Sequence, residues 1–272
     1  MDYVISDQDF KLFATLVYDK TGINLAQGNK KQLLQSRVNK VLRTRNIASY
    51  RDYYEIVKAD TTGGELEDFI NLISTNVTHF FREEKHFEYL REHWHKEFDF
   101  SKTNIVRIWC SASSTGEEPY TISITMRELL GDKFPYEIYA SDIDTKVLQK
   151  ASKGIYPMAS VEKMDKSYLK KYFQQGKGNA SGYVKVKENI RKPVNFHRVN
   201  LIEPFRMQHK FDIIFCRNVM IYFDTDTKSN IVEKFYHVMN PDALLCIGHS
   251  ESLNGFKHPF KYIQPATYKK ER

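Results

Sequence analysis

The sequence predicts an α/β fold in which a mostly parallel sheet follows a helical segment, and three observations support this. Residues 105–130 combine a short apolar run, a turn of small residues and a helix-like segment, the order found in the first crossover of a parallel sheet. Five of the six residues from Phe211 to Cys216 are apolar, as is typical of a strand buried on both faces. Residues before 78 carry helical spacing with little strand alternation.

The turn after the first strand indicates what kind of ligand the sheet binds. In IVRIWCSASSTGEEPYTISITM we expect a strand over 105–110 and a helix over 120–130, with Pro119 in its first turn. A dinucleotide site needs three glycines so that backbone amides can approach a pyrophosphate, but this turn has only Gly116, followed by Glu117 and Glu118. Two carboxylates would repel a phosphate and suit a ligand with a positive end, such as S-adenosylmethionine. Alternatively, both glutamates only complement the helix dipole, worth roughly 0.3–1 kcal/mol, and the turn alone leaves both interpretations open.

The composition is that of an ordinary soluble globular protein, with 41% hydrophobic and 28% charged residues among 272. No apolar run approaches the roughly 18 residues of a membrane span, and the N-terminal MDYVISDQDF lacks the pattern of a signal peptide. The three cysteines lie far apart in apolar runs, which predicts core residues in a reducing compartment and neither disulfides nor a zinc site. The net charge of +7 permits an acidic partner or nucleic acid without choosing between them.

The N-terminal part is expected to form four helices, over 10–18, 30–45, 50–58 and 65–77. The second helix has one apolar face, formed by Leu33, Leu34, Val38, Val41 and Leu42. Between Lys20 and Arg51 there are eight basic residues and no acidic one. A charge run is often only a solvated face, but the absence of compensating acid favours a docking surface for an acidic partner.

The next stretch, STNVTHFFREE over 74–84, places polar side chains around an aromatic pair. Asn76, Thr78 and Arg82 surround Phe80 and Phe81. Taken alone, the stretch predicts a helix cap and then a helix that continues to residue 94 and joins the helical domain to the sheet.

The remaining strands end in polar residues. A strand over 136–140 leads to Asp142, which lies 26 positions after Gly116 and is where an acidic residue binds ribose hydroxyls in such sheets. Alternatively, Asp142 and Asp144 cap the helix expected over 145–151, and both roles can hold if Asp144 is the cap.

After a helix over 160–173, a polar turn over 174–182 and a strand over 183–187 suggest a small insert. Strands over 194–199 and 211–216 end in Asn200-Leu201 and Arg217-Asn218. A helix over 225–239, a turn over 240–242, a strand over 244–247 and a closing hairpin within 260–270 complete the expected elements. The carboxyl ends of parallel strands share one edge, so Glu118, Asp142, Asn200 and Asn218 are expected to meet in one crevice.

Five motifs in order, TNVTHFFRE, ASSTGEEPYTI, ASDID, FDIIFCRNVMIYF and GHSES, closely resemble the chemotaxis receptor methyltransferases, the CheR family. The resemblance implies a helical N-terminal domain over 1–85 and a Rossmann-like class I methyltransferase domain over 86–272, with a small β-insert at about 174–193. It implies S-adenosylmethionine-dependent O-methylation of glutamates on the acidic cytoplasmic helices of methyl-accepting chemotaxis receptors, with S-adenosylhomocysteine as product. In some members the insert binds a receptor C-terminal peptide, and the resemblance leaves that role open here.

The resemblance also implies the site residues. Cofactor contacts carry over to Asn76, Thr78, Arg82, Glu118, Asp142, Asn200, Leu201, Arg217 and Asn218. Arg82 and Tyr222 are implied near the transferred methyl group, and no metal is implied. We expect a cytoplasmic monomer that neither inserts into a membrane nor takes nucleic acid as a partner.

Three other classes of protein can be compared with this sequence. A nucleic-acid base methyltransferase usually carries an Asn-Pro-Pro-Tyr-like loop after the fourth strand, and RNVMIYF has no proline there. A hydrolase elbow could be sought in GHSES, but its fifth position is not glycine and LNGFKHP after it is not helix-like. An adaptor that binds S-adenosylmethionine without transferring its methyl group remains an alternative.

Overall fold

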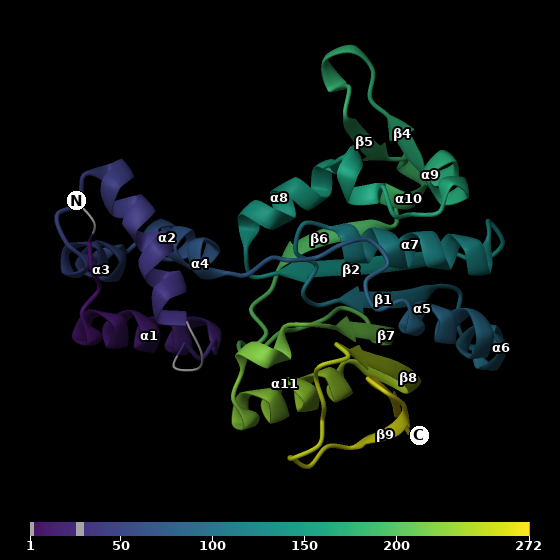
Figure 1. Cartoon of the computed structure of the whole chain (residues 1–272). Helices are drawn as coiled ribbons and strands as arrows, with labels where there is room; N and C mark the ends of the chain where they lie inside the picture. The colour runs from purple at the N-terminus through teal and green to yellow at the C-terminus, as the bar shows by residue number, and fades with distance from the viewer. Residues whose placement is uncertain (1–2, 26–29, 272) are drawn as a thin grey trace.

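The computed structural model describes residues 3–25 and 30–271, and its N-terminal part is helical, as expected. Ser6 and Ser49 cap two of the helices by accepting hydrogen bonds from backbone N–H groups in the first turn. Phe13, Tyr53 and Phe69 are buried in a core made by these helices and the turns that flank them. The helices are α1 (Asp7–Thr21), α2 (Lys30–Arg45), α3 (Tyr50–Ala59) and α4 (Gly64–Ile73), at the left of Figure 1.

The fourth helix ends earlier than the sequence predicts. The helical spacing predicts a helix up to residue 77, but α4 ends at Ile73 and Ser74 is extended. The chain leaves the helix because Asn76 bonds elsewhere: its side-chain amide donates to Asp144 Oδ2 (2.8 Å), and its carbonyl accepts from Ser114 Oγ (3.1 Å). These tertiary bonds outweigh local helix propensity, and they bring the segment to the edge of the sheet.

The sheet domain contains seven strands in the order β6-β2-β1-β7-β8-β10-β9. The first five are parallel, and β10 and β9 add an antiparallel hairpin, which confirms the expected closing hairpin. The strands are β1 (Val106–Cys110), β2 (Tyr136–Asp142), β6 (Val194–Arg198), β7 (Phe211–Cys216), β8 (Met239–Ile247), β9 (Phe260–Gln264) and β10 (Thr267–Lys270).

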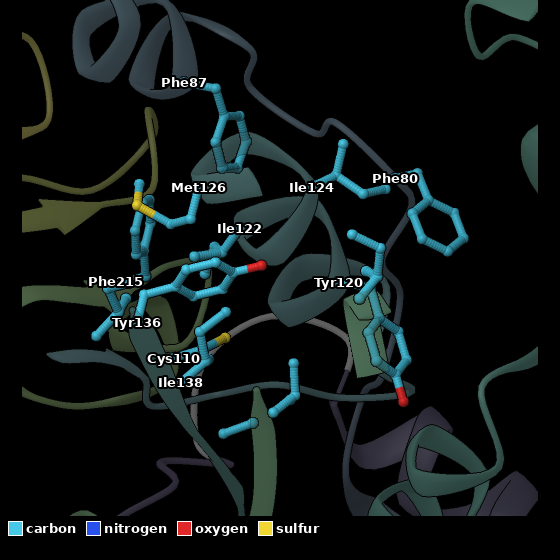
Figure 2. Close-up of a cluster of buried hydrophobic side chains, with 14 of the residues drawn as sticks. Phe80, Phe87, Cys110, Tyr120, Ile122, Ile124, Met126, Tyr136, Ile138 and Phe215 are labelled. Carbon is cyan, nitrogen blue, oxygen red and sulfur yellow. The ribbon is translucent and has the colours of Figure 1, made fainter. Parts of the chain in front are cut away.

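Helices cover both faces of this sheet because side chains alternate along each strand. In β1, Ile108 and Cys110 face one core, while Trp109 faces the other. Helices α7 (Glu117–Leu130) and α5 (Lys85–Tyr89) cover the first face, and α11 (Thr225–His237) covers the second. Figure 2 shows side chains of the first core, where the rings of Phe87 and Phe215 stack 5.8 Å apart.

The helical run after residue 84 confirms the expected continuation to Trp94, but it is not uniform. It starts with α5, widens into a π-helical turn over Leu90–Trp94, and ends with α6 (His95–Glu97). Phe87, Leu90 and Trp94 are all buried in the core against α7, so the apolar spacing correctly predicts the buried face.

A second, three-stranded sheet has the order β3-β5-β4 and lies at the top of Figure 1. The sequence indicates only the last of its strands, because the other two are three residues long and too short to show alternation. The sheet therefore begins at Ile155, before the range expected for the insert. Its elements and neighbours are α8 (Thr145–Lys153), β3 (Ile155–Pro157), α9 (Lys166–Tyr172), β4 (Phe173–Gln175), β5 (Tyr183–Val186) and α10 (Glu188–Arg191).

One expected turn is wrong. Residues 240–242 belong to β8, which begins at Met239, and only Val238 separates it from the end of α11 at His237. Asp242 has a φ of 65°, and the pairing of β7 with β8 shifts register nearby, so an irregular strand replaces the turn. Within residues 3–25 and 30–271, no helix combines the length and the apolar character needed to cross a bilayer.

Candidate functional site

A cavity of about 220 Å³ opens at the carboxyl edge of the parallel strands, between the sheet and the helical domain. Its walls come from the end of α1, from α2, from the 73–78 segment and from the loops after β1, β2, β6 and β7. All ten site residues implied by the resemblance line it: Asn76, Thr78, Arg82, Glu118, Asp142, Asn200, Leu201, Arg217, Asn218 and Tyr222. The structure thus brings together residues from five separate segments of the sequence.

Asp142 is held at the end of β2 by backbone amides. Its two carboxylate oxygens accept hydrogen bonds from Ser114 N (2.8 Å) and Asp144 N (3.0 Å). Burial raises the pKa of Asp142 to about 6, although these backbone bonds favour the ionised form. Asp144 accepts from Lys146 N and Val147 N at the start of α8. The two aspartates therefore divide their roles: Asp144 caps the helix and Asp142 faces the cavity.

The turn before α7 requires its single glycine. Gly116 has a φ of 97°, and a Cβ atom there would lie 2.6 Å from Tyr156 Oη and 2.9 Å from Ala151 Cβ. Glu118 lines the cavity, whereas Glu117 does not and instead accepts a bond from Thr115 Oγ1 (2.6 Å). Both glutamates are 7% exposed, so they are not the solvated dipole partners that the sequence left possible.

The guanidinium of Arg217 connects three parts of the site. It donates to Glu118 Oε2 (2.8 Å) and Glu83 Oε2 (3.2 Å), and also to the carbonyl of Arg82. The Arg217 side chain is 1% exposed, so this is a buried cation between two carboxylates. Burial raises the pKa of Glu118, and the charge of Arg217 opposes that rise.

Glu83 is a site residue that the sequence does not predict, although it lies inside the motif TNVTHFFRE. Its Oε1 accepts from Asn218 Nδ2 (3.0 Å), and its Oε2 accepts from His249 N (3.0 Å) as well as Arg217. Burial works to raise the pKa of Glu83, but its bonds with Asn218 and Arg217 outweigh burial and lower it. The only signal in the sequence was an acidic residue among polar and aromatic ones.

Glu251, in the motif GHSES, is a second site residue that the sequence does not predict. Its carboxylate accepts bonds from Gly248 N (2.6 Å), Asn218 N (2.9 Å) and Ile221 N (3.1 Å). Asn218 has a φ of 58°, a left-handed conformation that is uncommon for non-glycine residues and that asparagine tolerates better than most. Glu251 therefore fixes the backbone that carries Asn218 and leads to the short helix over Met220–Tyr222.

The helical domain contacts the cavity directly. Asn24 N donates to the carbonyl of Tyr222 (2.8 Å), and Lys30 Nζ lies 5.3 Å from the centre of the Tyr222 ring. Asn200 donates its side-chain amide to the carbonyl of Lys20 (2.8 Å). Lys30 was not expected at the site, because its contribution depends on how the two domains pack.

The basic stretch from Lys20 to Arg51 is less one-sided in the folded chain than in the sequence. Among the described residues, Lys31 pairs with Asp7, Arg45 pairs with Glu65 (2.6 Å) and Arg51 pairs with Glu55 (3.2 Å). The side chains of Lys40 and Arg43 are exposed on α2. The candidate docking surface is thus narrower than the charge run predicts.

Comparisons with known proteins agree with this architecture. The family model described as "CheR methyltransferase, all-alpha domain" matches residues 8–74, and "CheR methyltransferase, SAM binding domain" matches residues 76–269. The chemotaxis protein methyltransferase of Salmonella typhimurium is 38% identical over 97% of this chain and 90% of its own length. That of Borreliella burgdorferi is 39% identical over 98% of this chain and 95% of its own. The chain therefore belongs to the CheR family of methyltransferases, whose catalytic domain binds S-adenosylmethionine.

Proposed function

We propose that this chain methylates glutamate side chains on the cytoplasmic helices of methyl-accepting chemotaxis receptors, and that it acts in the cytoplasm as a monomer. The products are glutamate methyl esters and S-adenosylhomocysteine. The observation that carries the proposal is the composition of the cavity, which is lined by Glu118 in the helix after β1, by Asp142 at the end of β2, and by Arg82 and Tyr222. Membership of the CheR family supports the same reaction.

The residues present suit S-adenosylmethionine better than a dinucleotide. Each oxygen of Asp142 accepts one backbone N–H, and a carboxylate oxygen has a further lone pair, so both ribose hydroxyls can donate to it. A pyrophosphate would instead meet Glu118 at the N-terminus of α7. We assign ribose binding to Asp142. The other nine residues implied by the resemblance line the same cavity, and we assign them to contacts with the rest of the cofactor and with the reacting atoms.

The chemistry requires alignment more than acid–base catalysis. When bound, S-adenosylmethionine supplies an electrophilic methyl group, which the substrate carboxylate attacks in line. A free glutamate has a pKa of about 4.3, so it is ionised at neutral pH and needs no base. Correct orientation of two reactants can contribute up to roughly 7–11 kcal/mol. We assign Arg82 to orienting the incoming carboxylate and Tyr222 to a hydrogen bond near the reacting atoms.

Labelled S-adenosylmethionine and receptor-bearing membranes provide the direct test of this reaction. Labelled receptor treated with mild alkali is expected to release volatile methanol, because glutamate methyl esters hydrolyse. Label that resists alkali would indicate methylated nitrogen and exclude glutamate as the acceptor. A chain that binds the cofactor but never labels the receptor would be an adaptor.

The assignment of Asp142 predicts a change in cofactor affinity. Asp142→Asn is expected to weaken S-adenosylmethionine binding by roughly 1.5–3 kcal/mol, because hydrogen bonds to an ionised group are lost. The carboxyl group of Asp142 has a pKa of about 6 in the cofactor-free protein, and the ribose hydroxyls donate to its ionised form. The affinity of the wild type for S-adenosylmethionine should therefore fall as the pH drops from 7 to 5. Asp142→Asn should not show this fall, because the amide does not titrate. Calorimetry across this pH range measures both effects, and unchanged affinity in a folded variant would exclude the ribose assignment.

The basic face of α2 predicts a salt-dependent loss of methylation. Receptor helices are acidic, so exposed Lys40 and Arg43 are expected to attract them toward the cavity. The double variant Lys40→Glu/Arg43→Glu should keep cofactor affinity but methylate subsaturating receptor more slowly, and the difference should shrink as salt screens the charges.

The matched control reverses two exposed lysines outside α2, Lys96→Glu/Lys210→Glu. It changes the net charge equally and should leave methylation close to wild type. Equal rates for wild type and the α2 variant at low salt would mean that this face is only solvated.

A further inference from the structure

Three metal-ligating side chains lie together beside the cofactor cavity. Glu83, His86 and His249 each offer one ligand atom, and these atoms lie within 4.8 Å of one another. They come from the turn before α5, from α5 itself and from the loop after β8. The imidazole rings of His86 and His249 are 4.9 Å apart, and His249 N bonds Glu83 Oε2. Methyl transfer as described above uses neither histidine.

His86 has the hydrogen bonding of a metal ligand. Its Nε2 lies 3.3 Å from the carbonyl oxygen of Ala266, and because a carbonyl only accepts, Nε2 carries the proton. The lone pair is then on Nδ1, which has no hydrogen-bond partner among the described residues, although the residue is only 1% exposed. Ligating histidines typically donate their other N–H to such an oxygen, and a buried polar atom left without a partner requires an explanation.

The local charges permit a cation. Arg217 lies between two carboxylates, and Glu118 at 2.8 Å suffices to neutralise it. The carboxylate of Glu83 can therefore bind a metal ion as well as Arg217. Arg82 Nε also lies 4.0 Å from Glu83 Oε1, at the limit of an ion pair. His249 is exposed, so an ion can reach the cluster from solvent.

We propose that Glu83, His86 and His249 bind a divalent transition-metal ion such as Zn²⁺, and that the bound ion weakens binding of S-adenosylmethionine. Two imidazoles and one carboxylate suit Zn²⁺ and leave its fourth position to water. Metal–ligand bonds of about 2.0–2.2 Å require the three groups to move closer together. Glu83 would then loosen its bonds to Arg217 and Asn218, which both line the cofactor cavity.

Metal binding is tested without receptor or activity, so its failure would leave the proposed reaction unaffected. Purified full-length chain is titrated with Co²⁺, followed by visible absorption, and with Zn²⁺, followed by calorimetry. We expect one ion per chain and a cobalt spectrum of low coordination number. His249→Ala should weaken binding at least roughly tenfold and should fold normally because the side chain is exposed. His237→Ala, which removes an exposed histidine on α11, is the matched control. No binding, or equal binding by His249→Ala, would overturn the site.

The coupling has its own readout. Saturating Zn²⁺ should raise the dissociation constant for S-adenosylmethionine in wild type and in His237→Ala, but not in His249→Ala. By linkage, S-adenosylmethionine must weaken Zn²⁺ binding by the same factor. If Zn²⁺ leaves the S-adenosylmethionine affinity of the wild type unchanged, the coupling is refuted. If Zn²⁺ also lowers the S-adenosylmethionine affinity of His249→Ala, the effect comes from a metal bound elsewhere and the proposed coupling is wrong.

Discussion

Replacing Arg217 with methionine is expected to lower the free energy of unfolding by about 3–5 kcal/mol and to abolish methyl transfer. The variant would leave Glu118 and Glu83 facing a buried space without their cation. Denaturant unfolding at pH 7 measures the loss. The matched control is Arg51→Met, which breaks an exposed pair with Glu55 on the same helix and should cost less than about 1 kcal/mol.

The same variant has a distinctive pH dependence. Burial raises the pKa of Glu118 even with Arg217 present, and removal of the cation should raise it further. A carboxyl group whose folded-state pKa lies above its unfolded value gains folded-state stability as pH falls. The stability difference between Arg217→Met and wild type should therefore narrow on acidification. The double variant Arg217→Met/Glu118→Gln should recover part of the lost free energy of unfolding at pH 7. If Arg217→Met lowered the free energy of unfolding no more than Arg51→Met does, the buried ion network would not contribute to stability as described.

Tyr222→Phe is expected to lower turnover by about 10²-fold while changing cofactor affinity much less, because small misplacements of reacting atoms cost that much. The backbone of Tyr222 is fixed from two sides: Asn24 N bonds its carbonyl, and Glu251 anchors the preceding Ile221. The removed hydroxyl is then the main change. Turnover with saturating receptor and calorimetry of cofactor binding separate the two effects.

Arg82→Ala is expected to damage both turnover and cofactor affinity. Arg82 lines the cavity and donates to the carbonyl of Val77 (2.9 Å), so the substitution also loosens the segment after α4. Tyr262→Phe, which removes a hydroxyl from an exposed ring on β9, serves as the control for Tyr222→Phe. Full turnover by Tyr222→Phe at saturating receptor would rule out a positioning role for its hydroxyl.

The fold class and the location of the site could be predicted from the sequence because both depend on local patterns. The largely apolar run Phe211–Cys216 is a strand with the same bounds in the structure. A strand that is buried on both faces can be predicted from its own residues because nearly all of them are apolar. Polar residues that directly follow such strands, among them Asp142 and Asn218, line the cavity. They do so because parallel strands bring their carboxyl ends to one edge.

The tertiary structure alone decided which partners these residues have. Glu83 meets Arg217 across 134 positions of chain, and Glu251 holds Asn218 across 33. The acid that pairs with Arg45 lies on another helix, and α4 ends early because Asn76 bonds Asp144. Periodicity indicates which face of an element is buried. It carries no information about which distant carboxylate, amide or cation lies opposite, because that depends on how the elements pack.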